Sequence, residues 1–475
     1  LVWLPSWSSN GMSSSYRKIL MSSGAGESAW FSFYEATTTE YDVVNDLNLA
    51  IQVDSEDNIV TMRKITGATF GAAQIVVRSV DPDGNKRWEN RYSNTSTDAT
   101  FQSVGIAINP TNDNITVLAE YGERKINVFQ VSASTGASQW NILKELKNNG
   151  GNNFITKWSD IESDASGNLY GGAKSAVNGA NIGETYIKLN SSGIESAVRR
   201  NAGRNFTAEA LAVDSQSNFY QVGWLENTGV NRKYGVVAKF NSSGVMQWQK
   251  RVEGSALGTN SFCQFYSVCV DDQNNVIVGG YTSYAANNYA RVTKFNSSGT
   301  HQWTNDTQST ANPGSTFQYF AVAADSDGSI LATGELHSTG SNRNGAPVAK
   351  YSSSGTLEYC NNFRTTSSGI HAVVGNRIKV DSNKQPILIA QTLYTAGGAS
   401  PSSHIVAKLP KNGGAVPNTY STLTYEAGGV TGSSVTPTIT SLSAATNQLD
   451  FTDNQTPPTR TIAAITLPYD FLEIA

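Results

Sequence analysis

Charged residues are scarce in this chain of 475 residues. Asp, Glu, Lys and Arg together make up 15% of it, against roughly 25% in ordinary soluble proteins. The 34 basic residues are dispersed along the chain, singly or in pairs, and are outnumbered by 38 acidic ones. Nothing resembles the basic stripe that neutralises phosphates, so we predict no nucleic-acid partner. Runs of 18 apolar residues are also lacking, so no membrane-spanning helix is predicted.

Cysteine is rare as well. The three cysteines, Cys263, Cys269 and Cys360, are an odd number and show no metal-ligand spacing. A disulfide framework and a zinc site are therefore both excluded from the prediction.

Motifs of known catalytic sites are missing too. The sequence has no HExxH, no GxSxG elbow, no Walker loop and no dinucleotide fingerprint in a strand-turn-helix context. The four histidines lie in separate segments, at His301, His337, His371 and His404. We therefore predict a non-enzymatic protein with no catalytic, cofactor-binding or metal-binding residues, and we leave its binding residues unassigned.

What the chain has instead is a sevenfold internal repeat. The first landmark is an alternating apolar run that ends in Asp or Asn, followed by a polar turn and a second apolar run. Its copies lie 50 to 57 residues apart, at Asp54, Asn109, Asp164, Asp214, Asp271, Asp325 and Asp381. The second landmark is a strand-like run, a Ser/Asn/Pro turn and a Gly. Its copies lie 51 to 58 residues apart, at Gly84, Gly136, Gly193, Gly244, Gly299, Gly355 and Gly413.

Four short alternating runs in such a period are typical of a β-propeller blade, because each four-stranded sheet buries both faces against its neighbours. We predict an all-β fold, a propeller of four-stranded antiparallel blades with seven blades over residues 46–415. Residues 1–45 contain a half-blade at 17–34 that is expected to close the ring. The Thr/Ser-rich residues 416–475 are expected to dock on the ring or on a neighbouring subunit. The alternative is an eighth blade split between the termini, with 437–451 supplying the missing strands.

Three kinds of residue recur at fixed repeat positions. The Asp to Asn element, as in Asp214 to Asn218, invites comparison with calcium loops, but we interpret it as a turn that closes on its own backbone, since no copy supplies the bidentate Glu of an EF-hand. The fourth run carries an aromatic residue, for which we favour packing between blades over sugar stacking. These aromatic residues are Trp88, Trp140, Trp248, Trp303 and Tyr359. A basic residue of the third run lies either in a polar central channel or on the solvent side of a strand, and its copies include Lys188, Lys239, Lys294, Lys350 and Lys408.

Sequence variation concentrates between the second and third runs of each copy. In a propeller such loops share one face, which makes this face the candidate binding surface. The variable segments run from Thr66 to Gln74, Ala173 to Glu184, Glu226 to Tyr234, Ser283 to Ala290, His337 to Ala346 and Leu393 to His404.

The repeat units VDSQSNFYQVGW…VVAKFNSSGVMQWQK and VDDQNNVIVGGYTS…VTKFNSSGTHQW resemble the SBBP-type β-propeller repeat over roughly residues 46–413. The junction HIVAKLPKNGGAVPNTYSTLTYEAGG is similar to the ends of propeller-repeat structural proteins of marine tailed phages, such as cyanophages. This resemblance implies a non-enzymatic virion protein, a tail-associated or adhesin/fibre component that oligomerises within an assembly. Its implied partners are other virion proteins and host surface glycans, and its implied location is the virion.

Two other functions stay open. A secreted or surface bacterial adhesin would bind glycans with loop aromatics such as Trp224 and Tyr281. A propeller hydrolase or lyase would act on polysaccharide with acidic residues converging from different blades.

Overall fold

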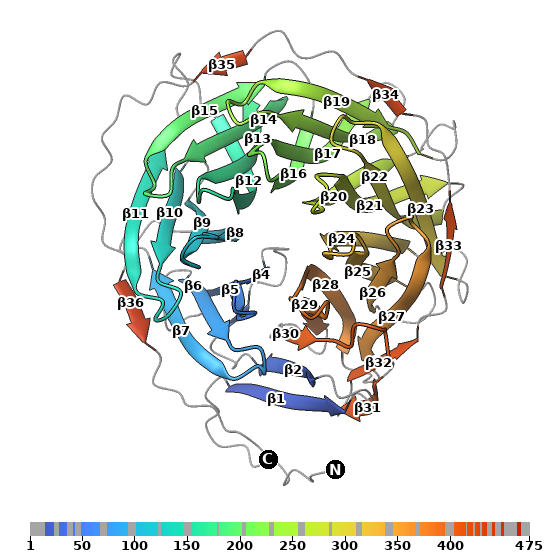
Figure 1. Cartoon of the computed structure of the whole chain (residues 1–475). Helices are drawn as coiled ribbons and strands as arrows, with labels where there is room; N and C mark the ends of the chain where they lie inside the picture. Colours follow the sequence, from blue (N-terminus) through green and yellow to red (C-terminus); the bar gives the residue numbers. More distant parts are fainter. Residues whose placement is uncertain are drawn as a thin grey trace.

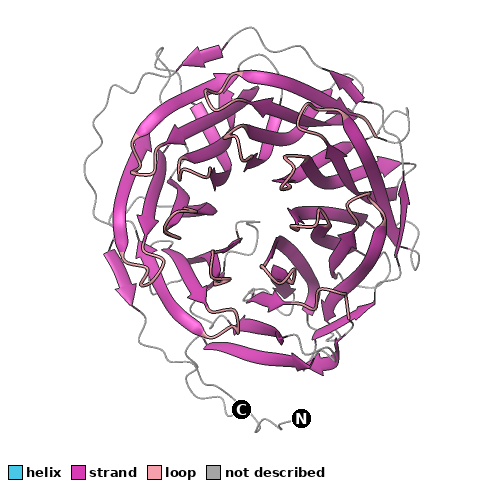
Figure 2. Cartoon of the chain, in the orientation of Figure 1, coloured by secondary structure: helices cyan, strands magenta, loops and turns pink. Residues whose placement is uncertain are grey.

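The computed structural model describes most of the repeat region and parts of both ends. The described residues are 15–22, 28–35, 41–42, 49–66, 74–93, 101–121, 125–145, 154–177, 180–201, 206–227, 232–254, 262–284, 287–309, 316–337, 345–365, 370–394, 403–414, 416–420, 423–427, 430–434, 439–441, 448–450 and 463–466. Within these ranges every regular element is a strand (Figure 2). No helix in them is long and apolar enough to cross a membrane.

Seven antiparallel sheets stand side by side around a central axis, which is a seven-bladed propeller (Figure 1). The predicted fold class is confirmed. From the axis outward, blades 1 to 3 consist of β4 (Ala50–Val53), β5 (Ile59–Thr66), β6 (Gln74–Val80) and β7 (Lys86–Ser93); β8 (Phe101–Ile108), β9 (Ile115–Tyr121), β10 (Lys125–Val131) and β11 (Ser138–Glu145); and β12 (Phe154–Ser163), β13 (Leu169–Val177), β14 (Ala180–Leu189) and β15 (Glu195–Asn201). A short strand, β3 (Tyr41–Asp42), pairs with β5 beyond the end of β4.

Blades 4 to 6 follow the same plan. They consist of β16 (Phe206–Val213), β17 (Phe219–Asn227), β18 (Arg232–Phe240) and β19 (Met246–Val252); β20 (Cys263–Val270), β21 (Val276–Tyr284), β22 (Asn287–Phe295) and β23 (His301–Ser309); and β24 (Thr316–Ala324), β25 (Ile330–His337), β26 (Ala346–Tyr351) and β27 (Leu357–Thr365).

Both ends of the chain build blade 7. Its inner strands come from the last repeat as β28 (Ile370–Val380), β29 (Pro386–Tyr394) and β30 (Ser403–Lys408), and its fourth strand is β2 (Ser28–Glu35). Trp30 lies opposite Lys408 in the β2–β30 ladder, and β1 (Ser15–Ser22) adds a fifth strand outside β2. The ring therefore closes by pairing the N-terminal segment with the last repeat.

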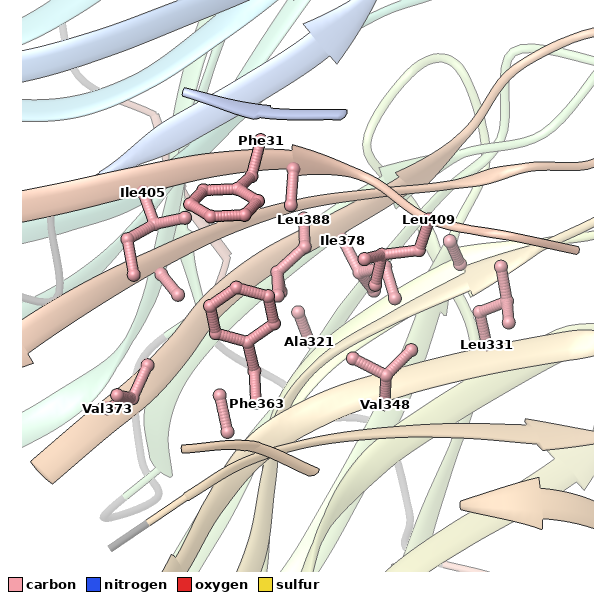
Figure 3. Close-up of a cluster of buried hydrophobic side chains, with 14 of the residues drawn as sticks. Phe31, Ala321, Leu331, Val348, Phe363, Val373, Ile378, Leu388, Ile405 and Leu409 are labelled. Carbon is pink, nitrogen blue, oxygen red and sulfur yellow. The ribbon is translucent and has the colours of Figure 1, made fainter. Parts of the chain in front are cut away.

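Apolar side chains fill the spaces between neighbouring blades. In the cluster between blades 6 and 7, Phe31 from β2 meets Phe363 from β27 edge to face, with ring centroids 5.9 Å apart (Figure 3). Leu388 and Ile405 of blade 7 and Val348 of blade 6 surround them. The ring-closing strand thus brings its own apolar residue into the shared core.

The C-terminal extension runs back around the outside of the ring and adds a strand to most blades (Figure 1). These outer strands are β31 (Val416–Tyr420) and β32 (Leu423–Ala427) on blade 6, β33 (Val430–Ser434) on blade 5, β34 (Ile439–Ser441) on blade 4, β35 (Gln448–Asp450) on blade 3 and β36 (Ala463–Thr466) on blade 1. Because β34 and β35 join two different blades, residues 437–451 do not form an eighth blade, and the alternative prediction is wrong.

The first landmark forms the turn between the two inner strands of each blade. In blade 4, the Oδ1 atom of Asp214 accepts hydrogen bonds from the backbone N–H groups of Gln216 and Asn218 at 3.0 and 2.8 Å. Its Oδ2 atom accepts a further one from the Asn218 amide at 2.9 Å. Asp54 and Asp271 repeat this pattern. The predicted turn-closing role of these carboxylates is confirmed.

Candidate functional site

The recurring aromatic residues join neighbouring blades. The indole of Trp303, on β23 of blade 5, donates a hydrogen bond to the Ser353 carbonyl of blade 6 at 3.0 Å. Its ring lies on Gly355, whose φ of +88° shapes the turn. Trp88 and Trp248 make the same contact to the next blade, at 2.8 and 3.1 Å. Packing of these rings between blades is therefore confirmed.

The seam between blades 7 and 1 uses the same device. Trp30 donates to the Pro82 carbonyl of blade 1 at 3.1 Å, and its ring lies on Gly84. Blade 3 has Ala197 at the aromatic position, and there the Tyr186 ring lies on Gly244 instead. We name this contact between an aromatic ring and the turn glycine of the next blade the clasp.

Three of the recurring lysines, Lys239, Lys294 and Lys408, lie in neither of the two predicted places, because they are buried and bind the turn carboxylate of their own blade. Lys350 is only partly buried and pairs with Glu358 of the same blade. The ammonium group of Lys294 is 2.9 Å from Asp271 Oδ2, and that of Lys408 is 2.9 Å from Asp381 Oδ2. Lys239 combines a 3.4 Å contact to Asp214 with a 3.2 Å hydrogen bond to the Ser297 carbonyl of the next blade. A lysine side chain is long enough for its ammonium group to reach both the turn of its own blade and the next blade, which explains why lysine recurs at this position.

The central channel is nearly filled by side chains of the inner strands. A cavity of about 40 Å³ remains, bordered by all seven blades, which is room for a few water molecules. Lys379 of blade 7 reaches across to Glu162 of blade 3 at 3.5 Å, and Gln52 of blade 1 donates to the same carboxylate at 3.3 Å. Side chains of opposite blades therefore cross-link the described part of the channel.

One channel carboxyl has a strongly shifted pKa. Burial, and then the negative charge of Glu162, raise the pKa of Asp160 to about 7, against the opposing effect of Arg377 and Lys379. Sequence analysis missed this group, because its partners lie on blades 3 and 7 and share no spacing. Among the described residues, no three His, Cys, Asp or Glu side chains gather as a metal site requires.

The variable loops of the predicted binding face lie largely outside the described residues. The parts not described are 67–73, 178–179, 228–231, 285–286, 338–344 and 395–402. The strand ends that lead into these loops are described, and they form the rim of that face. In blades 4 to 6 this rim carries a distinctive set of side chains.

A glycine in the second strand shapes the rim of each of these three blades. A Cβ on Gly280 would lie 1.9 Å from the Gln264 carbonyl oxygen, so only glycine allows the first strand to come this close. Opposite it, Tyr266 is unpaired between Phe265 and Ser267, as a β-bulge. Blades 4 and 6 repeat this pairing of close glycine and bulged residue, with Gly223 and Glu209, and with Gly334 and Phe320.

The residue after each of these glycines stands beside the bulge. Blades 4 and 5 have Trp224 and Tyr281 there, and their rings gather around Tyr266. The centroid of Tyr266 is 5.9 Å from Trp224 at 81°, 5.9 Å from Tyr281 at 19°, and 5.5 Å from Phe320 at 66°. We call Trp224, Tyr266, Tyr281 and Phe320 the rim cluster; all four are partly exposed.

Polar groups hold the rim cluster in place. The side-chain amide of Gln264 donates a hydrogen bond to the Tyr281 hydroxyl at 2.6 Å and accepts one from the Tyr266 hydroxyl at 3.4 Å. The ammonium group of Lys233 lies 5.4 Å from the centre of a Trp224 ring. Burial raises the pKa of Tyr281 to about 12, so its hydroxyl stays protonated at neutral pH. The sequence indicated Trp224 and Tyr281 as loop aromatics, which is wrong, because both lie in strands, β17 and β21. It missed Tyr266 and Phe320, because a bulge has no signature in the alternation of a strand.

Comparisons with known proteins describe the fold alone. No family model matches the chain, and no curated protein matches it. Among solved structures, a chain of the mitotic checkpoint complex is similar at 12% identity and a TM-score of 0.47, covering 78% of this chain and 94% of that one. The β-propeller domain of the trilobed protease from Pyrococcus furiosus is similar at 11% identity and a TM-score of 0.41, covering 76% and 92%. The Hadza microbial sialidase Hz136 is similar at 8% identity and a TM-score of 0.40, covering 62% and 63%. Likenesses this distant assign no function.

Proposed function

We propose that this protein is a non-enzymatic structural component of a tailed-phage virion, tail-associated or part of an adhesin or fibre, that presents the loop face of its ring to a partner. The non-enzymatic role rests on one observation: the recurring polar and aromatic side chains make contacts within the ring itself. Trp303 and Lys239 each donate a hydrogen bond to a carbonyl of the next blade, and side chains of opposite blades cross-link the channel. These groups therefore contribute rigidity and are not arranged around a substrate.

The junction at residues 404–429 supports the phage assignment. It resembles the ends of phage propeller-repeat proteins, and it leads from β30 of the last blade to the outer strands β31 and β32. A ring tied in this way suits a particle part that must keep its shape. Other virion proteins and host surface glycans are its proposed partners, and the virion is its proposed location.

Purified particles test this proposal. Mass spectrometry should detect the chain at a constant copy number per particle, and cryo-electron microscopy should show a sevenfold ring in the tail region. Absence of the chain from purified virions would refute the assignment. Incubation with host capsule and lipopolysaccharide should leave their chain lengths unchanged, since depolymerisation would indicate the hydrolase or lyase alternative.

The rim cluster favours a second candidate, a secreted or surface adhesin of a bacterium. Partly exposed aromatic rings next to amide and carboxylate groups are suited to ligand binding in either setting. Fractionation of the source cells separates the two candidates, because an adhesin would be found on the cell surface without infection.

A further inference from the structure

We propose that the rim cluster, together with Glu209 and Glu335, forms a binding site for uncharged hexopyranose glycans. This inference gives a ligand class to the non-catalytic binding role proposed above and rests on that role. A pyranose ring presents an apolar face of C–H groups and an edge of hydroxyls. It therefore fits where aromatic faces and hydrogen-bonding groups stand side by side.

The ring geometry supplies the stacking faces. Trp224 and Tyr266 meet edge to face, at 81°, which fixes the angle between the two rings. Tyr281 stacks on Tyr266 at 19°, so each of these two rings has its other face left for a sugar. Because the four rings come from three blades, the rigid sheets hold the cluster, which needs little ordering when a ligand binds.

Polar groups around the rings supply the hydroxyl contacts. Glu209 is the bulged residue of blade 4, and its charge acts on Tyr266. Glu335 follows the close glycine of blade 6, at the position that Tyr281 has in blade 5. Carboxylates accept hydrogen bonds from sugar hydroxyls. These two carboxylates outnumber the single ammonium group of Lys233 beside Trp224, so the charges of the site favour an uncharged glycan over an anionic one.

The position that Trp224 and Tyr281 have in blades 4 and 5 holds other residues elsewhere in the ring, so the fold itself does not require an aromatic ring there. Blades 1, 2, 3 and 7 carry Lys64, Glu120, Lys174 and Gln391. Their bulged positions, where assigned, carry Val104, Ser159 and Asn376. The aromatic residues are thus confined to blades 4 to 6, whereas the clasp recurs around the ring. Such a local departure from the repeat points to a ligand and not to packing.

A glycan array with the full chain tests the site. The probes are immobilised oligomers of glucose, galactose, mannose and N-acetylglucosamine, beside sialylated and sulfated oligomers. We expect binding to at least one neutral class, measured again by isothermal titration calorimetry. Tyr281→Ala and Trp224→Ala should each weaken it at least tenfold. Tyr281→Phe, which keeps the ring face, should keep affinity within about threefold. Glu120→Ala, at the equivalent position in blade 2, should leave affinity unchanged.

Four outcomes would overturn the inference: no binding to any array member, binding only to anionic glycans, binding that both alanine variants retain, or a loss in Glu120→Ala equal to that in Tyr281→Ala. Circular dichroism and the denaturation midpoint establish that each variant is folded. Where Trp224→Ala fails to fold, Tyr281→Ala and Tyr281→Phe still decide the question. Failure here is distinct from failure of the virion assignment, because a chain found in particles without glycan binding would refute only this inference.

Discussion

The clasp makes a quantitative prediction at Gly355. Its φ of +88° is unfavourable for any residue with a Cβ, which costs about 1–2 kcal/mol. A Cβ there would also lie 2.5 Å from Cδ2 of Trp303, and overpacking of this kind costs about 1–3 kcal/mol. Gly355→Ala should therefore lower the free energy of unfolding by about 2–5 kcal/mol.

Gly328 of the same blade is a matched control. Its φ is +80°, but a Cβ would meet nothing closer than Ser353 Cβ at 3.3 Å. Gly328→Ala should therefore cost only the backbone contribution of about 1–2 kcal/mol. Guanidinium denaturation followed by circular dichroism measures both variants. Combining Gly355→Ala with Trp303→Ala should remove the steric part of the cost, as a double-mutant cycle detects. Equal losses in the two glycine variants would refute the clasp.

Further predictions concern charge and closure. Lys294→Met leaves the buried Asp271 carboxylate without its 2.9 Å partner and should lower the free energy of unfolding in urea by about 3–5 kcal/mol. Lys384→Met breaks the exposed pair with Asp327 at the same 2.9 Å and should leave the urea midpoint nearly unchanged, because solvent screens an exposed pair. Burial alone would raise the pKa of Asp271, but hydrogen bonds from Asn275 and Lys294 hold it below its ordinary value. The stability that the ionised Asp271 contributes should therefore be present above about pH 4 and decline as pH falls through the lowered pKa. This decline should be smaller in Lys294→Met. The pH dependence due to Asp160 has the opposite sign. Because its pKa is about 7 in the folded protein, its carboxyl makes the fold less stable as pH rises from about 4 to 7. Asp160→Asn should abolish that decline, as measured by denaturation midpoints at pH 5 and pH 8. Phe31→Ala removes the buried ring that meets Phe363 and should cost about 3–5 kcal/mol, seen as a lower melting temperature in calorimetry.

Three results would contradict these predictions. Equal costs for Lys294→Met and Lys384→Met would mean that burial does not strengthen the Asp271 pair. An unchanged pH dependence in Asp160→Asn would mean that another group titrates in the channel. A Phe31→Ala variant as stable as the parent chain would mean that β2 contributes little to closure.

The repeat was readable from the sequence because its residues act locally or between equivalent neighbours. Asp214 closes its own turn, and in every copy a glycine with positive φ follows the turn residue after 27 to 32 residues. The roles of Lys239 and Asp160 could not be predicted, because their partners lie on another strand or across the channel. The rim cluster depends on a bulge, which shifts register by one residue and leaves the composition of the strand unchanged.

Closure of the ring depends on contacts between the two ends of the chain. The strand β2 can pair only after the last repeat has supplied β30, so residues as distant as Trp30 and Lys408 must meet. Such non-local pairing is slow, because the entropy of closing the loop is lost before the contact forms. The outer strands β32 to β35 pair with blades 6, 5, 4 and 3 in turn, so the chain crosses the boundaries between these blades a second time. These strands also cover sheet edges that would otherwise invite aggregation. The seam between blades 7 and 1 has β2, the Trp30 clasp and the Lys408 contact to Pro82 instead. The irregular ends of the chain therefore close the ring. The rim of blades 4 to 6 also departs from the repeat, and closure of the ring does not explain that departure.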